Sequence, residues 1–413
     1  MKNIRKTVLD NGLRLLSEKM PGAASVALGI WVDAGARDES PEENGLAHLI
    51  EHMVFKGTPG RDKTAIAREI DRQGGQANAF TSREQTCYHT RVRPEDLESA
   101  LDLLVDIFQN SLYDEAELEL EKRVIQQEIA MIEDEPEEMV HDLAAAGFWP
   151  GHHLGRPVAG TRLSVAALKR EQILIWLDRQ CPGPRLVISA AGAVEHQRLA
   201  DLLSVRLKAR PALAERLLEA PESRYGLTVR RRRLEQAHMV IRSDFPEIED
   251  DRRQAAAVLS RILGDGFSSR LFQEIRERRG LAYSVYSSYS AFLKAGALEI
   301  YAATSPERAA RTRDLVLAEL KRLRREAPGA AELNEAVEGL ITGLILGSET
   351  VENRMSRLAK NELLFGRAVS LAETCRRLKA VSREDLRELA DQYWAEDRLA
   401  VCVLGPLSRK DFE

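Results

Sequence analysis

The sequence predicts an α+β fold of two structurally similar halves, each a mainly antiparallel sheet with helices packed on one face. Three observations lead to this prediction. The chain has 413 residues, which is long for a single domain. Strand patterns come early in each half, and long helical patterns follow them. Two segments also repeat along the chain at one fixed spacing.

The repeat has a single offset, the interval that separates Arg170 from Arg383. At this offset the start of one helical pattern, 169–173, reads like 382–386. The segment 185–192 likewise reads like 398–405, and both are short apolar strands that end in glycine. An ungapped match of two motifs at one offset indicates an internal duplication.

Prolines and a glycine mark the boundary between the halves, at Pro211, Pro221 and Gly226. We therefore predict a catalytic zinc-binding half at residues 1–210, a linker at 211–226, and a homologous half at 227–413. The second half contains no counterpart of the two histidines introduced below. Any metal chemistry should therefore belong to the first half.

The strands of both halves can be placed from local patterns. A hairpin turn is expected at Asp10-Asn11-Gly12. Residues 26–32 alternate as on a half-buried strand, and two more strands are expected at 76–81 and 86–93. In the second half we expect strands at 237–245, 282–292 and 297–303, followed by several helices.

Composition argues against several classes of protein. Sixty basic and 65 acidic residues give a net charge of −5, so no overall field favours nucleic acid. No segment has enough uninterrupted apolar residues to cross a membrane, and the N-terminus lacks the character of a secretory signal. We expect a bacterial cytoplasmic protein. Isolated cysteines without zinc-ligand or disulfide spacing agree with a reducing compartment: Cys87, Cys181, Cys375 and Cys402.

A short apolar segment carries the most informative motif, His48-Leu49-Ile50-Glu51-His52. Its histidines are four residues apart, so on a helix they share one face, about 6 Å apart along the axis. Two imidazoles at this spacing can bind one zinc ion. Glu51 flanks the same site, where a carboxylate can act as a general base toward a metal-activated water. The alternative is a pair of hydrogen-bonded core histidines.

A second helical pattern offers the third ligand that a catalytic zinc site needs. It begins near Asp114, a suitable N-cap residue. Two carboxylates, Glu121 and Glu128, interrupt its buried stripe, where an unpaired charge would be costly. Spacing alone does not choose between them. The stripe follows steps of three and four residues: Leu118, Glu121, Ile125, Glu128 and Ile132.

These motifs resemble the pitrilysin and mitochondrial-processing-peptidase family of inverted-motif (HxxEH) zinc peptidases. The resemblance covers nearly the whole chain and includes the segments 44–58, 124–129, 154–161 and 268–283. It implies one zinc ion per subunit, held by His48, His52 and Glu128, because the family's third ligand follows the second histidine at the interval found here between His52 and Glu128. It also implies that Glu51 is the general base and that Glu121 supports the site from behind the ligands.

The resemblance extends to residues that would bind substrate. It implies that Arg276 grips a substrate carbonyl and that the Tyr283 hydroxyl stabilises the oxyanion. Without it, these would be a surface arginine and an ordinary strand aromatic. The segment Asn78-Ala79-Phe80 fits the family's substrate-binding edge strand, which would add an extended peptide to the sheet. The alternative is an internal strand without a free edge.

We therefore expect a zinc metalloendopeptidase that hydrolyses oligopeptides or unstructured protein segments. The length fits the family's branch of roughly 400 residues, in which two subunits pair. A homodimer would then share its active sites, with the zinc residues from one subunit and the Arg/Tyr pair from its partner. Two alternatives remain: a non-catalytic scaffold or chaperone-like subunit, and a heterodimer with an inactive paralogue.

Overall fold

The computed structural model describes residues 3–208, 216 and 218–412. The chain forms two compact units that interleave in sequence. The first unit comprises Met1–Ala130, Arg156–Arg216 and Leu346–Val369, and the second comprises Met131–Gly155, Leu217–Ile345 and Ser370–Glu413. These packing units differ from the contiguous halves expected from the duplication. Residues 211–215 and 217 of the expected linker lie outside the described residues.

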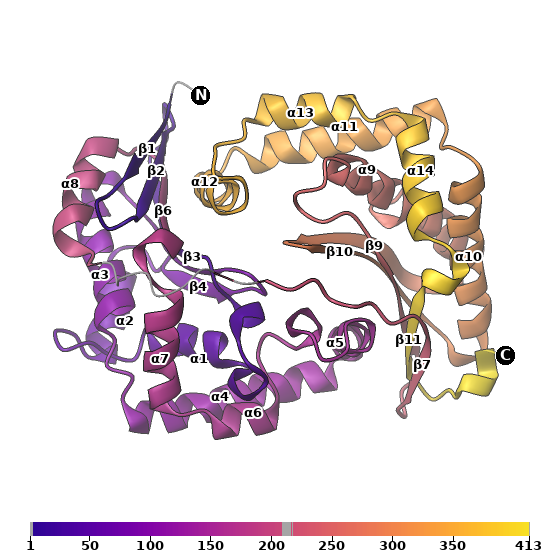
Figure 1. Cartoon of the computed structure of the whole chain (residues 1–413), viewed down its shortest axis with the longest axis horizontal. Helices are drawn as coiled ribbons and strands as arrows, with labels where there is room; N and C mark the ends of the chain where they lie inside the picture. Colours follow the sequence, from indigo (N-terminus) through magenta and orange to yellow (C-terminus); the bar gives the residue numbers. More distant parts are fainter. Residues whose placement is uncertain (1–2, 209–215, 217, 413) are drawn as a thin grey trace. The chain divides into compact units, whose positions relative to one another are not determined.

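The first unit contains a six-stranded sheet in the order β1-β2-β6-β3-β5-β4 (Figure 1). All neighbouring strands are antiparallel except β2 and β6. The predicted turn at Asp10–Gly12 joins β1 and β2, and Gly12 adopts a φ of +82° that favours glycine. The strands are β1 (Ile4–Val8), β2 (Arg14–Lys19), β3 (Val26–Val32), β4 (Asn78–Thr81), β5 (Thr86–Val92) and β6 (Leu186–Gly192).

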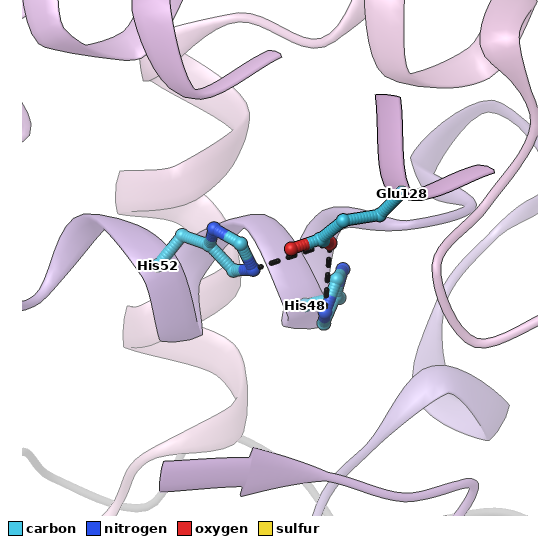
Figure 2. A group of neighbouring side chains, drawn as sticks. All are labelled: His48, His52 and Glu128. Atoms are coloured by element: carbon cyan, nitrogen blue, oxygen red, sulfur yellow. Dashed lines mark ion pairs between the residues drawn. The ribbon is translucent and has the colours of Figure 1, made fainter. Parts of the chain in front are cut away.

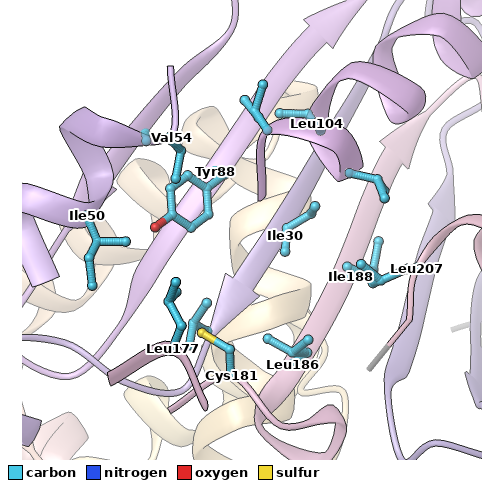
Figure 3. Packing of buried hydrophobic residues seen from close by; sticks show 14 of the residues in the cluster. Ile30, Ile50, Val54, Tyr88, Leu104, Leu177, Cys181, Leu186, Ile188 and Leu207 are labelled. Carbon is cyan, nitrogen blue, oxygen red and sulfur yellow. The ribbon is translucent and has the colours of Figure 1, made fainter. Parts of the chain in front are cut away.

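Helices cover one face of this sheet and enclose the main core of the unit. Figure 3 shows Ile30 and Tyr88 of the sheet together with Ile50 and Val54 from the segment that carries the histidine motif. The helices of this unit are α1 (Leu46–Met53), α2 (Lys63–Arg72), α3 (Leu97–Asn110), α4 (Glu115–Asp134), α6 (Arg162–Ala167), α7 (Arg170–Gln180), α8 (His196–Arg206) and α12 (Val351–Phe365). The last residues of α4 belong to the second unit.

Strand β3 is buried on both faces, so the expectation of a half-buried strand was wrong. The reason is α12, which reaches this sheet from a segment far along the chain. Its Met355 packs on Trp31 and accepts a hydrogen bond from the indole Nε1 at 3.3 Å. A Cβ on Gly29 would lie 2.7 Å from the Met355 sulfur, so this glycine permits the close approach.

The second unit contains a five-stranded sheet in the order β7-β11-β8-β10-β9. This order repeats β2-β6-β3-β5-β4 of the first sheet, and β7 and β11 are parallel as β2 and β6 are. The strands β6 and β11 end at Gly192 and Gly405, which are separated by the same offset as the repeated motifs, in agreement with a duplication. The strands are β7 (Gly226–Arg231), β8 (Ala237–Asp244), β9 (Ala282–Phe292), β10 (Ala295–Thr304) and β11 (Ala400–Gly405).

The second sheet also has helices on both faces. Helix α5 (Pro136–Phe148) comes from the first half of the sequence, yet its Val140 and Ala144 pack on Val240 and Tyr301 of the second sheet. The two halves of the sequence therefore exchange helices: α5 packs in the second unit, and α12 packs in the first. The other helices are α9 (Arg253–Gly264), α10 (Ala309–Arg325), α11 (Ala330–Gly347), α13 (Leu371–Lys379) and α14 (Arg383–Tyr393).

The predicted fold class is confirmed: two similar α+β halves, each built on a mainly antiparallel sheet. The structure adds the exchanged helices, one on the second face of each sheet. Among the described residues, no helix is both long enough and apolar enough to cross a membrane.

Candidate metal centre

Helix α1 presents its ionisable side chains on one face because the opposite face is buried. Leu46, Leu49, Ile50 and Met53 follow the spacing of a helical stripe and belong to the main core of the first unit. The remaining face carries His48, Glu51 and His52, all of them half-buried. Packing of the apolar stripe therefore fixes the direction in which these three side chains point.

Glu128 of α4 meets both histidines of α1. Its Oε2 lies 3.9 Å from His48 Nε2 and 3.6 Å from His52 Nε2. Figure 2 shows the carboxylate pointing between the two imidazoles. Within the described part of the chain, these three side chains form the one group whose ligand atoms all lie within 4.8 Å of one another. The arrangement can hold a metal ion.

Electrostatics favour the form of the histidines that binds metal. Burial, and then the neighbouring His52, lower the pKa of His48 to about 4, so this imidazole is neutral near pH 7. A neutral imidazole has a lone pair available for a metal ion. His52 is oriented by a second interaction, because its Nδ1 lies 3.1 Å from Glu121 Oε2. An N–H donated from Nδ1 to this carboxylate leaves Nε2 unprotonated toward Glu128.

The two carboxylates of the α4 stripe therefore have different places in the structure. Glu128 faces the Nε2 atoms of both histidines, whereas Glu121 contacts the far side of the His52 ring. Glu121 is 6% exposed, and Lys56 balances its charge through an ion pair of 2.7 Å. This lysine follows α1 closely in sequence, so Glu121 ties the end of the motif to α4.

Glu51 lies beside the metal cluster without belonging to it. Burial raises the pKa of its carboxyl group, and hydrogen bonds with Thr81 act in the opposite direction. Its Oε2 is buried and has no hydrogen-bond partner among the described residues. A carboxylate with one unsatisfied oxygen next to a metal centre is suited to accept a proton from water.

Strand β4 lies at the edge of its sheet and pairs with β5 alone among the described strands. It lies next to α1, the helix that carries His48, Glu51 and His52 and is called the metal helix below. Thr81 Oγ1 donates a 3.5 Å hydrogen bond to the carbonyl of Ala47 in this helix. Along the strand, Asn78 is exposed, Ala79 is buried and Phe80 is half-buried. The predicted substrate strand is therefore an edge strand beside α1.

Arg276 and Tyr283 contact each other in the second unit. A π-helix at Phe272–Glu277 precedes β9, and Tyr283 lies near the start of that strand. The Arg276 guanidinium lies 4.7 Å from the centres of both the Phe272 and the Tyr283 rings. The tyrosine is 78% exposed. The pair is thus preassembled by cation–π contacts, while His48, His52 and Glu128 belong to the first unit.

Sequence reasoning assigned no individual role to three residues that contact the site's side chains or the helix that carries them: Lys56, Thr81 and Glu39, which is treated below. Thr81 and Glu39 reach α1 from other segments by tertiary packing, whereas Lys56 follows α1 directly in the sequence. The only local signal was the lysine close behind the motif, where a positive charge can pair with the predicted acid of the other helix.

The donor set fits zinc. Two imidazole nitrogens and one carboxylate match the ligands of catalytic zinc sites and leave a coordination position for water. Calcium and magnesium prefer sites made of oxygen ligands alone. The second ring nitrogen of His52 is held by a carboxylate, as is usual for metal-bound histidines.

This fold and this site together define a class of protein: a duplicated α+β chain whose first unit carries a candidate metal centre of two histidines and a glutamate. Residues 14–162 match the family described as insulinase (peptidase family M16), and residues 167–340 match the peptidase M16 inactive domain. A Bacillus subtilis protein named uncharacterized zinc protease YmxG is 37% identical over 407 residues, 98% of each chain. The chain belongs to the M16 peptidase family.

A second relative agrees with this assignment, and a solved structure shares the fold. A Mycobacterium tuberculosis protein named uncharacterized zinc protease Rv2782c is 38% identical over 413 residues, covering 98% of this chain and 94% of the relative. A solved structure of a protease from Helicobacter pylori has the same fold, with a TM-score of 0.91 at 19% identity and coverage of 98% and 99%. Both relatives named as zinc proteases have nearly the length of this chain, in keeping with the small-subunit branch of the family.

Proposed function

We propose that this chain is a zinc-dependent endopeptidase that hydrolyses peptide bonds in oligopeptides or unstructured protein segments. The observation that carries the proposal is the convergence of His48, His52 and Glu128, with Glu51 on the same face of α1. Zinc bound there would act as a Lewis acid and activate a water molecule. Glu51 would accept the proton of that water and later deliver it to the leaving amine.

The proposed substrate class follows from the edge position of β4, which pairs with β5 alone among the described strands. An extended peptide can add to this edge through backbone hydrogen bonds, which would bring it beside α1. Only a segment without its own secondary structure has these backbone groups free. Arg276 and Tyr283 would bind the substrate carbonyl and the developing oxyanion, since a guanidinium and a phenol both donate hydrogen bonds.

We further propose a homodimer whose active sites combine zinc residues from one subunit with the Arg276–Tyr283 pair of the partner. The alternative assembly is a heterodimer with an inactive paralogue. Presence of both residue sets in one chain supports the homodimer, because no element of the proposed site then has to come from another gene product. A bacterial cytoplasmic location remains a prediction that cell fractionation would test.

Removing the metal should abolish peptidase activity. The protein purified with zinc is expected to cleave an unstructured peptide, to lose this cleavage on dialysis against a chelator, and to regain it with one equivalent of zinc. Metal content per chain and cleavage are measured on the same samples. A protein that binds no zinc, or that binds zinc and cleaves no unstructured peptide, would instead support the scaffold or heterodimer alternatives.

Glu121 should affect activity through the metal. In a Glu121→Gln variant the His52 Nδ1–H keeps only a neutral acceptor, and Lys56 loses its ion-pair partner. We expect zinc affinity to fall about 10- to 100-fold, the usual effect of removing such a partner. Competition with a chromophoric chelator measures it. Activity at saturating zinc should recover most of its wild-type value, and a loss that zinc does not restore would assign Glu121 a direct catalytic role.

A further inference from the structure

The metal helix does not cap its own N-terminus. Helix α1 has only eight residues, and its N-cap position is Gly45, which has no side chain to accept a hydrogen bond. Short helices are marginal by themselves, and their first backbone N–H groups need acceptors from elsewhere. A capping side chain could not be introduced at Gly45, because it has a φ of +95° and its Cβ would lie 2.8 Å from the Ala159 carbonyl.

Glu39 supplies the missing acceptors from the segment that precedes the helix. Its Oε1 accepts the backbone N–H of Ala47 at 2.8 Å, and its Oε2 accepts that of Gly45 at 2.9 Å. The Asn44 side-chain amide donates to the same Oε2 at 3.3 Å. The residue is fully buried, with 0% of its surface exposed. Both carboxylate oxygens are therefore committed to the start of α1.

A second segment holds this capping arrangement in place. Arg156 donates to the Glu39 backbone carbonyl at 3.2 Å, and Asn44 donates to the Pro157 carbonyl at 3.0 Å. Gly160 lets this segment approach Asn44 closely, because a Cβ at this position would lie 2.6 Å from the Asn44 carbonyl oxygen. This loop belongs to the segment 154–161, which the family resemblance includes without giving it a role.

Burial and hydrogen bonding act in opposite directions on the carboxyl group of Glu39. Burial raises its pKa to about 8, and the two backbone N–H groups and the Asn44 amide act in the opposite direction. All three of these groups are donors, so none of them would accept a proton held by the carboxyl group. A carboxylate at a helix N-terminus also interacts favourably with the helix dipole. A neutral apolar side chain would leave the N–H groups without an acceptor.

The two histidines of the site depend on this cap to different degrees. His52 lies in the second turn, and its ring is held by Glu121. His48 is the third helical residue after the Gly45 N-cap, and its Nδ1 has no hydrogen-bond partner among the described residues. Its position is therefore set by the backbone of the first turn, which frays if the terminal N–H groups lose their acceptor.

We propose that Glu39 is a positioning residue of the metal centre, whose two buried carboxyl oxygens accept the N–H groups of Gly45 and Ala47 and so fix the first turn of α1 and thereby the place of His48. This inference rests on the zinc site of the proposed function. Glu39 does not touch metal or substrate; it acts through the backbone of α1. Its loss should lower the affinity for metal even in a protein that is otherwise folded.

The test compares Glu39→Gln with Glu362→Gln. In the first variant the side-chain –NH₂ group faces a backbone N–H donor. One of the two hydrogen bonds from the backbone N–H groups of Gly45 and Ala47 is therefore lost. Glu362 is a matched control: its side chain is 1% exposed in the same unit, and it pairs with Lys6 at 2.7 Å and Arg14 at 3.3 Å. Among the described residues, neither of these partners forms a hydrogen bond or ion pair with α1. Zinc affinity of the metal-free proteins is measured by chelator competition, with thermal unfolding of each apoprotein recorded beside it.

We expect Glu39→Gln to bind zinc about tenfold more weakly than wild type, and Glu362→Gln to bind it within about twofold despite a comparable loss of thermal stability. Unchanged affinity in Glu39→Gln, or an equal loss in both variants, would overturn the positioning role. If Glu39→Gln is not obtained folded, Asn44→Ala decides by the same comparison, since it removes one donor to Glu39 and the contact with Pro157. A wild-type protein that binds no zinc would instead overturn the proposed function itself.

Discussion

A Glu51→Gln variant is expected to lose about 10³-fold in kcat while it keeps its zinc, the typical effect of removing a general base. The substitution preserves the size of the side chain but removes the group that would accept a proton. Glu51 is not among the three residues whose ligand atoms converge, so zinc content should stay at the wild-type value. Burial raises the pKa of the wild-type carboxyl group, so the neutral amide should not destabilise the fold.

This result is measured by steady-state kinetics on an unstructured peptide, with zinc content and thermal unfolding determined on the same preparations. Glu171→Gln is the control, because Glu171 is an exposed carboxylate on α7 of the same unit. It should retain full activity. If Glu51→Gln retained more than a tenth of wild-type kcat with its zinc in place, another group would have to be the base.

Mixing two inactive variants should restore activity if active sites form between subunits. We expect Glu51→Gln and Tyr283→Phe to be inactive alone. A purified dimer with one copy of each would have one site carrying both lesions and one site carrying neither. Such a dimer should show about half of the wild-type kcat per dimer. Sites formed within single chains predict no rescue, because each site would then carry one lesion.

The mixed dimer is obtained by coexpression with two different affinity tags and purification on both. Glu51→Gln paired with His52→Ala is the control: both lesions lie in the zinc set, so each site carries one of them whichever way the sites are assembled. That dimer should stay inactive. An active monomer in light scattering would contradict the homodimer, and an inactive wild-type chain that gains activity from a paralogue would favour the heterodimer.

The sequence by itself determined the local parts of this protein. The i, i+4 spacing of His48 and His52, with apolar residues on the other face, was enough to predict a metal helix, since the helical period fixes which side chains share a face. Asp114 was predicted as an N-cap, and its side chain accepts the N–H groups of Ala116 and Glu117 at 2.9 and 3.2 Å. The fixed offset predicted the duplication because each copy keeps its own local pattern.

Tertiary structure decided what depends on the packing of distant segments. Glu121 and Glu128 are two turns apart on one stripe, about 10 Å along the helix axis. Their spacing left both open as ligands, and only the family resemblance favoured one. The crossing of α4 over α1 determines which carboxylate meets the Nε2 atoms and which meets His52 Nδ1.

The exchange of α5 and α12 could not be read locally, because an apolar stripe fits the face of either sheet equally well. The same holds for the cap of the metal helix. Gly45 marks where α1 begins in the sequence. Only the fold brings Glu39 to the first N–H groups of α1 and places Arg156 against the Glu39 backbone. Helical periodicity thus fixed what the metal helix presents, and long-range packing decided what holds it in place.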